Sequence, residues 1–194
     1  MSFLGYLTIG LCIIWAIPEI RNTNRRRSKV PSSDKDRHSL LVVMAANYIS
    51  IAAAVVIKLV PAADGSIGAV KMLSPFLGYL GCIVMILGMV IRWRAITTLK
   101  QQFTIDVAIV EGHKLVDTGL YAIIRHPAYL GGQLTLLGLG LALENWLSLL
   151  ILFVLPMAAH LYRISVEEKV LVDHFASAYE DYMKRTKRLI PGVF

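Results

Sequence analysis

The longest apolar run of the chain, residues 127–162, is too long to cross a membrane once. As a single α-helix it would extend about 54 Å, whereas the hydrocarbon core of a bilayer is about 30 Å thick. Glu144-Asn145 is the only polar place at which the run could turn. The run therefore predicts a tight hairpin of two membrane helices, over residues 127–143 and 145–162. We expect four glycines to let these helices approach closely: Gly131, Gly132, Gly138 and Gly140.

Three further apolar runs are long enough to span a membrane, at residues 3–20, 39–60 and 72–91. Hydrophobic residues make up 56% of the 194 residues, above the roughly 45–50% of soluble domains, and they gather in blocks. These features predict an all-α, multi-span membrane protein with five transmembrane helices in a single domain over residues 1–194. Beyond the last span, apolar residues at helical spacing predict a cytoplasmic amphipathic helix over residues 163–185.

The distribution of basic residues predicts the orientation in the membrane. Residues 21–38, residues 92–126 and the C-terminal region hold seven, five and six basic residues, and five spans place all three regions on one side. Because cytoplasmic loops are rich in Lys and Arg, we expect the amino terminus outside and the polar segments in the cytoplasm. The membrane would be the cell membrane of a prokaryote or the endoplasmic reticulum of a eukaryote. The same bias explains the net charge of +7, which therefore predicts no nucleic-acid partner.

Residues 113–129 form the longest mixed polar segment between apolar runs, and their composition is unlike that of a linker. They hold two His, two Tyr, an Arg, a Pro and a Gly, and Arg125-His126-Pro127 lies where the fourth span begins. Arg125 and proline would suit a simple interfacial anchor before a helix. The His and Tyr content instead favours the wall of a small-molecule site at the membrane surface. No spacing of His, Cys and carboxylates is typical of a metal site, so we expect no metal.

Arg163 and Glu167 lie four positions apart, so a helix would carry both on one face. They could form a surface pair that stabilises the helix at the membrane edge. They could also face the same pocket as His126, where the guanidinium could hold an anionic group with two hydrogen bonds. The spacing alone leaves both interpretations open.

The pattern Gly119-x-Tyr121-x-x-x-Arg125-His126-Pro127-x-Tyr129, followed by an apolar hairpin and Glu167-Glu168, resembles the isoprenylcysteine carboxyl methyltransferase family. The resemblance runs from about Phe103 to the C-terminus, and the chain length suits the compact, five-span members of the archaeal type. The family implies S-adenosylmethionine as methyl donor, S-adenosylhomocysteine as product, and a cofactor-binding region over residues 103–194. Phospholipid methyltransferases and the carboxyl-terminal part of sterol reductases contain similar pieces.

The resemblance also implies roles for individual residues. The implied cofactor contacts are His113, Lys114, Leu115, Val116, Tyr121, His126, Pro127, Ala128, Tyr129 and Glu167. Arg163 matches the catalytic-site arginine associated with the substrate. A glutamine contact of the eukaryotic members corresponds by counting to Asp106, because Gln101 and Gln102 are too early to align without a shift.

The implied reaction is methylation of the carboxylate of a prenylated cysteine, or of a similar lipid-linked carboxylate, at the surface of the lipid bilayer. A carboxylate is already a nucleophile at neutral pH, so the reaction requires no general base. Methyl transfer gains from alignment and from exclusion of water, and Arg163 would orient the carboxylate. Two alternatives remain open: a phospholipid N-methyltransferase, whose amine acceptor would require a base, and a non-catalytic membrane scaffold.

Overall fold

The computed structural model describes residues 2–25, 34–59, 61–62, 65–66, 68, 75–104 and 114–194. Its helices are α1 (Phe3–Arg25), α2 (Asp34–Leu59), α3 (Phe76–Leu99), α4 (Pro127–Ala142), α5 (Trp146–Phe175) and α6 (Ser177–Arg185). Two short 3-10 helices, η1 (Lys100–Gln102) and η2 (Gly119–Ala122), precede α4. The two-residue strands β1 (Pro61–Ala62) and β2 (Gly65–Ser66) pair antiparallel, with Pro61 opposite Ser66. Apart from this short hairpin, the described residues confirm the prediction of a helical fold.

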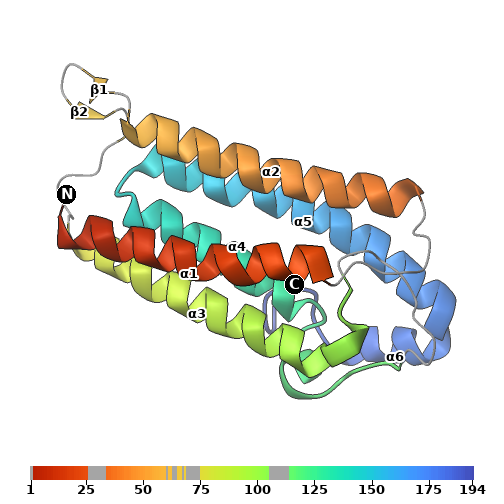
Figure 1. The fold of residues 1–194 in the computed structure, drawn as a ribbon. Coiled ribbons are helices and arrows are strands. Elements are labelled where there is room, and N and C mark those ends of the chain that lie inside the picture. Colours follow the sequence, from red (N-terminus) through yellow and green to blue (C-terminus); the bar gives the residue numbers. More distant parts are fainter. Residues whose placement is uncertain are drawn as a thin grey trace.

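Helices α1 to α5 lie side by side along one direction, as Figure 1 shows, and α6 lies at one end of the bundle. The strands β1 and β2 lie at the opposite end. The closest packing is that of α3 on α4 and of α2 on α5, and α1 packs on α3. The core between the helices is built from apolar side chains that include Leu11, Met85, Leu136, Leu139 and Leu152.

Four of the described helices are long and apolar enough to cross a membrane, over Phe3–Asn22, Asp36–Leu59, Phe76–Leu99 and Trp146–Phe175. Helix α4 has 16 residues, which is about 24 Å and less than the roughly 30 Å of a hydrocarbon core. Large apolar side chains point outward from the bundle, including Phe3, Tyr48, Leu59, Phe76 and Trp93. Exposure of so large an apolar surface to water is unfavourable, whereas the hydrocarbon core of a bilayer would cover it. The protein is therefore an integral membrane protein.

The turn between α4 and α5 lies where the sequence predicted it. Asn145 caps α5, because its side-chain oxygen accepts hydrogen bonds from the N–H groups of Leu147 at 3.1 Å and Ser148 at 3.0 Å. These bonds satisfy two donors that a helix start leaves without an internal partner. Glu144 adopts a left-handed backbone with φ of 53°, which lets the chain reverse between the two helices.

The glycines of α4 face α3 more than α5, so our expectation about their partner is confirmed for Gly140 and wrong for the other three. A Cβ atom added at Gly138 would lie 2.6 Å from the carbonyl oxygen of Gly81, and one at Gly131 would lie 2.7 Å from that of Gly88. Of the four glycines, only Gly140 has its nearest neighbour in α5. Helix α3 carries its own glycines opposite those of α4, which allows the two backbones to touch.

Two predicted helix boundaries were also wrong. Helix α3 runs past residue 91, because an ion pair with Glu19 accommodates Arg92 inside the bundle. Helix α5 runs through Arg163 without a break, as expected for a helix that continues past the membrane, but it ends at Phe175 and not at residue 185. The chain leaves the helical path at Ala176, whose φ is 47°, and only α6 is separate. Residues 26–33 of the basic segment and residues 72–74 of the third span lie outside the described residues.

The backbone contact of α3 with α4 predicts a strong effect of adding a methyl group there. We expect Gly138→Ala to destabilise the protein by about 1–3 kcal/mol, as overpacking typically does, because the added Cβ meets the backbone of α3. Thermal unfolding in detergent micelles measures the effect. The matched control is Gly10→Ala in α1, where nothing lies within 4 Å of an added Cβ. Equal melting temperatures of the two variants would contradict the assignment of this contact.

Candidate active site

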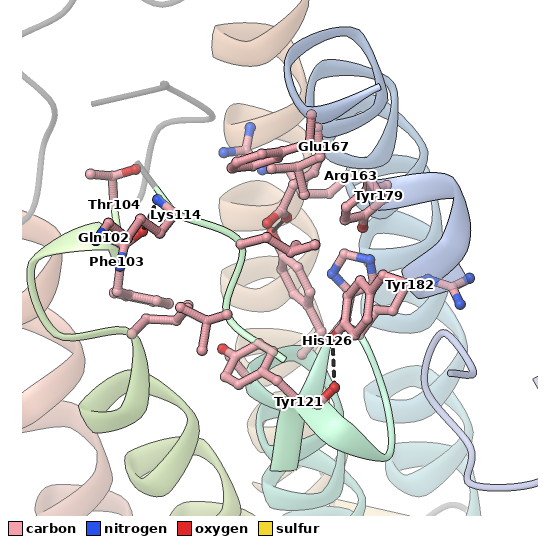
Figure 2. Close-up of a pocket in the computed structure, with 18 of the residues that line it drawn as sticks. Gln102, Phe103, Thr104, Lys114, Tyr121, His126, Arg163, Glu167, Tyr179 and Tyr182 are labelled. Atoms are coloured by element: carbon pink, nitrogen blue, oxygen red, sulfur yellow. Dashed lines mark hydrogen bonds between the residues drawn. The ribbon is translucent and has the colours of Figure 1, made fainter. Parts of the chain in front are cut away.

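A cavity of about 190 Å³ lies where η1, η2, the start of α4, the later turns of α5, and α6 meet. Figure 2 shows Gln102, Phe103, Thr104 and Lys114 on one side of this cavity, with Arg163, Glu167 and Tyr179 across from them. The first turns of α2 also contribute, through Leu40 and Val43. The cavity thus combines residues from both halves of the chain.

Nine of the eleven predicted site residues line the cavity: Lys114, Leu115, Val116, Tyr121, His126, Ala128, Tyr129, Arg163 and Glu167. Pro127 is buried at the first position of α4, behind the lining. His113 lies outside the described residues, as does Asp106, the counted equivalent of the family's glutamine. The tertiary structure therefore brings together the polar segment before α4 and the charged turns of α5.

The two helices of the hairpin meet at the cavity through Tyr129 and Glu167. The Tyr129 hydroxyl donates to Oε2 of Glu167 at 2.9 Å. Tyr129 lies in the first turn of α4, where Pro127 begins the helix. The His126 ring lies 5.8 Å from the Tyr129 ring, between centroids. One wall of the cavity therefore offers a carboxylate, a phenol and an imidazole.

Arg163 is buried, with 3% of its side chain exposed, so the interpretation as a surface pair was wrong. Its Nη1 donates to the carbonyl oxygen of Asp36 at 2.9 Å and to Oγ of Ser39 at 2.6 Å. The same nitrogen forms an ion pair with the Asp36 carboxylate, which is fully buried. Asp36 and Ser39 belong to the first turns of α2, so Arg163 joins α2 to α5 beside the cavity.

Glu168 is the centre of a buried ionic cluster, although in the sequence it was noted only as part of the Glu167-Glu168 pair and was given no role. Its Oε1 accepts a hydrogen bond from Arg125 Nε at 2.8 Å and lies 3.3 Å from His126 Nε2. Its Oε2 accepts from Arg188 Nε at 2.8 Å. Because a buried carboxylate requires paired partners, Glu168 holds the Arg125-His126 pair in one orientation. The only signal in the sequence was its position beside Glu167.

The C-terminal segment completes this cluster through its backbone. The N–H groups of Arg125 and His126 donate to the carbonyl oxygens of Lys187 at 2.8 Å and Arg188 at 3.0 Å. Nη1 of Arg125 also donates to the carbonyl oxygens of Met183 and Thr186. The residues before α4 are thereby fixed against the chain that follows α6.

Buried tyrosines form the aromatic side of the cavity. The Tyr182 hydroxyl donates to the carbonyl oxygen of Tyr121 at 2.6 Å (Figure 2). Burial raises the pKa of Tyr182 to about 12, and it also raises the pKa values of Tyr121 and Tyr179. All three side chains therefore stay protonated at neutral pH, and they offer the cavity apolar ring faces.

Gln102 is a cavity residue that counting along the sequence passed over. Its side-chain oxygen accepts a hydrogen bond from the N–H of Lys114 at 2.7 Å, which joins the two ends of the segment between them. Phe103 and Thr104 line the cavity beside it. The available signal was a pair of glutamines shortly after the end of α3. Among the described residues, no group of three or more His, Cys, Asp or Glu side chains could hold a metal ion.

The fold and the cavity define a helical integral membrane protein with a polar pocket at one end of its bundle. Residues 80–173 match the model of the Isoprenylcysteine carboxyl methyltransferase (ICMT) family. This region covers most of α3, all of α4 and most of α5, and it contains the pocket residues from Arg92 to Leu171. This region spans 94 of the 194 residues and is similar to the isoprenylcysteine carboxyl methyltransferase family, as the resemblance of the motif predicted.

Curated relatives show the same similarity. The chain is 36% identical over 116 residues to a protein-S-isoprenylcysteine O-methyltransferase of Saccharomyces cerevisiae, covering 59% of this chain and 48% of the relative. It is 35% identical over 115 residues to protein-S-isoprenylcysteine O-methyltransferase B of Arabidopsis thaliana, covering 58% of each. The chain spans about half the length of these relatives.

A solved structure is also similar. It is the eukaryotic intramembrane Ras methyltransferase ICMT (isoprenylcysteine carboxyl methyltransferase), determined without a monobody. The TM-score is 0.54 at 25% sequence identity, and the match covers 85% of this chain and 55% of that one. Helices α1 and α2 precede the region of the family model, although α2 contributes to the pocket.

The burial of the Glu168 cluster predicts that its neutralisation destabilises the protein. We expect Glu168→Gln to cost about 3 kcal/mol, because Arg125 would lose its ionic partner in a buried position. Thermal unfolding in micelles measures the loss. Asp181→Asn is the control, since it removes the acid of an exposed ion pair with Lys184, and we expect no measurable change in melting temperature. Equal melting temperatures of Glu168→Gln and Asp181→Asn would show that the cluster does not stabilise the fold.

Proposed function

We propose that this protein is an S-adenosylmethionine-dependent methyltransferase that acts on the carboxylate of a prenylated cysteine or a similar lipid-linked carboxylate. The observation that carries the proposal is the meeting of Arg163, Glu167 and Tyr129 in one cavity at the end of membrane helices. These residues lie within the region matched by the family model. The relatives, which are protein-S-isoprenylcysteine O-methyltransferases, support a methyl acceptor of the isoprenylcysteine class.

The chemistry of the cavity lining fits S-adenosylmethionine. The Glu167 carboxylate can accept hydrogen bonds from hydroxyl or ammonium groups. Ring faces of Tyr121, Tyr179 and Phe103 can stack on a purine. By the resemblance, the residues that would hold the cofactor are His113, Lys114, Leu115, Val116, Tyr121, His126, Pro127, Ala128, Tyr129 and Glu167. Gln102 joins them as a polar lining residue.

The residues of this chain would act by orientation and by exclusion of water. When bound, S-adenosylmethionine supplies an electrophilic methyl group on a sulfonium. The acceptor carboxylate is ionised at neutral pH, so no side chain has to remove a proton. Arg163 would hold that carboxylate in line with the methyl group, and Asp36 and Ser39 keep the guanidinium in place. The buried Tyr179 and Tyr182 of α6 would keep water from the reacting atoms.

The membrane topology that we propose has five spans, with α4 as the fourth despite its short length. The amino terminus would lie outside, and the cavity would face the cytoplasm, in the cell membrane of a prokaryote or the endoplasmic reticulum of a eukaryote. The excess of basic residues near the cavity end supports this orientation. We further propose that residues 1–194 act as one domain, with residues 103–194 as the cofactor-binding region. The lipid tail of the acceptor would then reach the cavity from the bilayer.

The decisive experiment measures transfer of a labelled methyl group by the purified chain. We expect methylation of farnesyl- or geranylgeranyl-cysteine analogues and none of phosphatidylethanolamine, whose amine would require a base. A parallel calorimetric titration with S-adenosylhomocysteine should show binding. No binding at millimolar ligand would refute the proposal. Methylation of the phospholipid alone would show that the acceptor is a phospholipid amine and not a prenylcysteine carboxylate.

Arg163→Ala separates the acceptor from the methyl donor. We expect kcat/KM for the prenylcysteine analogue to fall about 100-fold, the effect of losing a charged hydrogen-bond partner, while S-adenosylhomocysteine still binds. Retained binding also shows that the variant is folded. Arg94→Ala is the control, because Arg94 is an exposed arginine of α3 and we expect its activity to stay within about twofold of the unaltered protein. Full activity of Arg163→Ala would remove this residue from the mechanism.

Glu167→Gln tests the cofactor side of the same wall. We expect it to weaken S-adenosylhomocysteine binding about tenfold, because a charge-assisted hydrogen bond becomes a neutral one. Isothermal titration measures the affinity, with Glu180→Gln on the exposed face of α6 as the matched control. An unchanged affinity in Glu167→Gln would contradict the role of this carboxylate.

A further inference from the structure

Positive side chains dominate the lining of the cavity. Four cationic residues face a single carboxylate, Glu167; they are Arg92, Lys114, Arg125 and Arg163. Under the proposed function, the methyl donor brings a sulfonium cation into this cavity. Like charges repel strongly where water is excluded, so this lining alone would disfavour the donor.

Carboxylates behind the lining pair with all three arginines. Arg125 pairs with Glu168 of α5, as described above. Arg92 of α3 donates through Nη2 to Oε2 of Glu19 at 2.7 Å, and its Nε also pairs with that carboxylate. Arg163 pairs with Asp36. These three carboxylates and Glu167 equal the four cations of the lining in number.

Two of the three carboxylates come from outside the region matched by the family model. Glu19 lies on α1 and Asp36 lies on α2, whereas the match begins at residue 80. Asp36 is fully buried, and the side chain of Glu19 is only 26% exposed. Such charges are weakly screened by solvent, so their effect extends into the cavity.

The ion pair of Arg92 with Glu19 lies next to the predicted cofactor motif. Nη1 of Arg92 donates to the carbonyl oxygen of Ala128 at 3.0 Å, and Ala128 itself lines the cavity. Arg163 lies on the opposite helix, α5, one turn before Glu167. The two N-terminal carboxylates therefore reach the cavity from two different helices, through two different arginines.

We infer that Glu19 and Asp36 are specificity-determining residues, which neutralise the pocket arginines and so set the preference for a cationic methyl donor over its neutral product. The inference rests on the proposed function. S-adenosylmethionine carries one positive charge more than S-adenosylhomocysteine, because the sulfonium becomes a thioether when the methyl group leaves. Removing one negative charge beside the cavity weakens binding of the donor more than binding of the product.

The test measures both affinities on the full chain in detergent micelles. Isothermal titration gives the dissociation constants of S-adenosylmethionine and S-adenosylhomocysteine for the unaltered protein, Asp36→Asn and Glu19→Gln. Asp36→Asn keeps an oxygen that can accept from Arg163 and removes the charge. We expect each variant to lower the preference for the donor by about three- to tenfold, the effect of one unit charge across a partly buried site.

Two controls separate charge from structure. Ser39→Ala removes another partner of the same Arg163 nitrogen without a change in charge, and we expect the ratio of the two affinities to stay constant. Glu144→Gln removes a carboxylate at the turn between α4 and α5, away from the cavity. It should leave the ratio constant as well.

The outcomes are distinct. An unchanged ratio of the two affinities in Asp36→Asn and Glu19→Gln would overturn the inference, whether both ligands bind more weakly by the same factor or neither is affected. If Asp36→Asn does not fold, Glu19→Gln decides the question, since it acts on a different helix. Failure of the unaltered protein to bind either ligand would overturn the proposed function itself.

Discussion

The pairing of every charge on the buried face of α5 determines how the rest of the chain surrounds that helix. Arg163 is held by the start of α2, Glu167 by Tyr129 of α4, and Glu168 by Arg125, His126 and Arg188. An unpaired charge in a medium of low polarity costs several kcal/mol, so these contacts must form together. They bring the start of α2, the start of α4 and the C-terminal segment to one place, and the cavity lies between them.

A second constraint acts through small residues. The glycines of α3 and α4 let the two backbones touch, and this close approach carries Arg92 to the carbonyl oxygen of Ala128. Helix α3 thereby supports the motif that begins α4, and Glu19 extends this support to α1. The packing in the apolar part of the bundle therefore places the charged residues at its end close enough to pair. Residues far from the family-matched region influence the pocket by this route.

The resulting pocket suits a reaction that requires alignment more than proton transfer. Its tyrosines are kept protonated by burial, and its arginines are held by carboxylates. Such a lining can orient two charged reactants without rearranging, which is how preorganised sites lower a barrier. The same pairing keeps the net charge of the lining low. Under the proposed function, this pairing would let the pocket hold a cationic methyl donor next to an anionic acceptor.

The sequence by itself determined the membrane class, the hairpin at Glu144-Asn145, and the motif from Tyr121 to Tyr129, because hydropathy and turn chemistry act over neighbouring residues. Only the tertiary structure decided which helix the α4 glycines face, how far α3 and α5 extend, and that Arg163 is buried against Asp36. It also brought Gln102 to Lys114 and made Glu168 a centre of ion pairs. These features depend on which distant segments meet. A polar residue in an apolar run is tolerated only where such a partner exists, and a one-dimensional pattern does not name that partner.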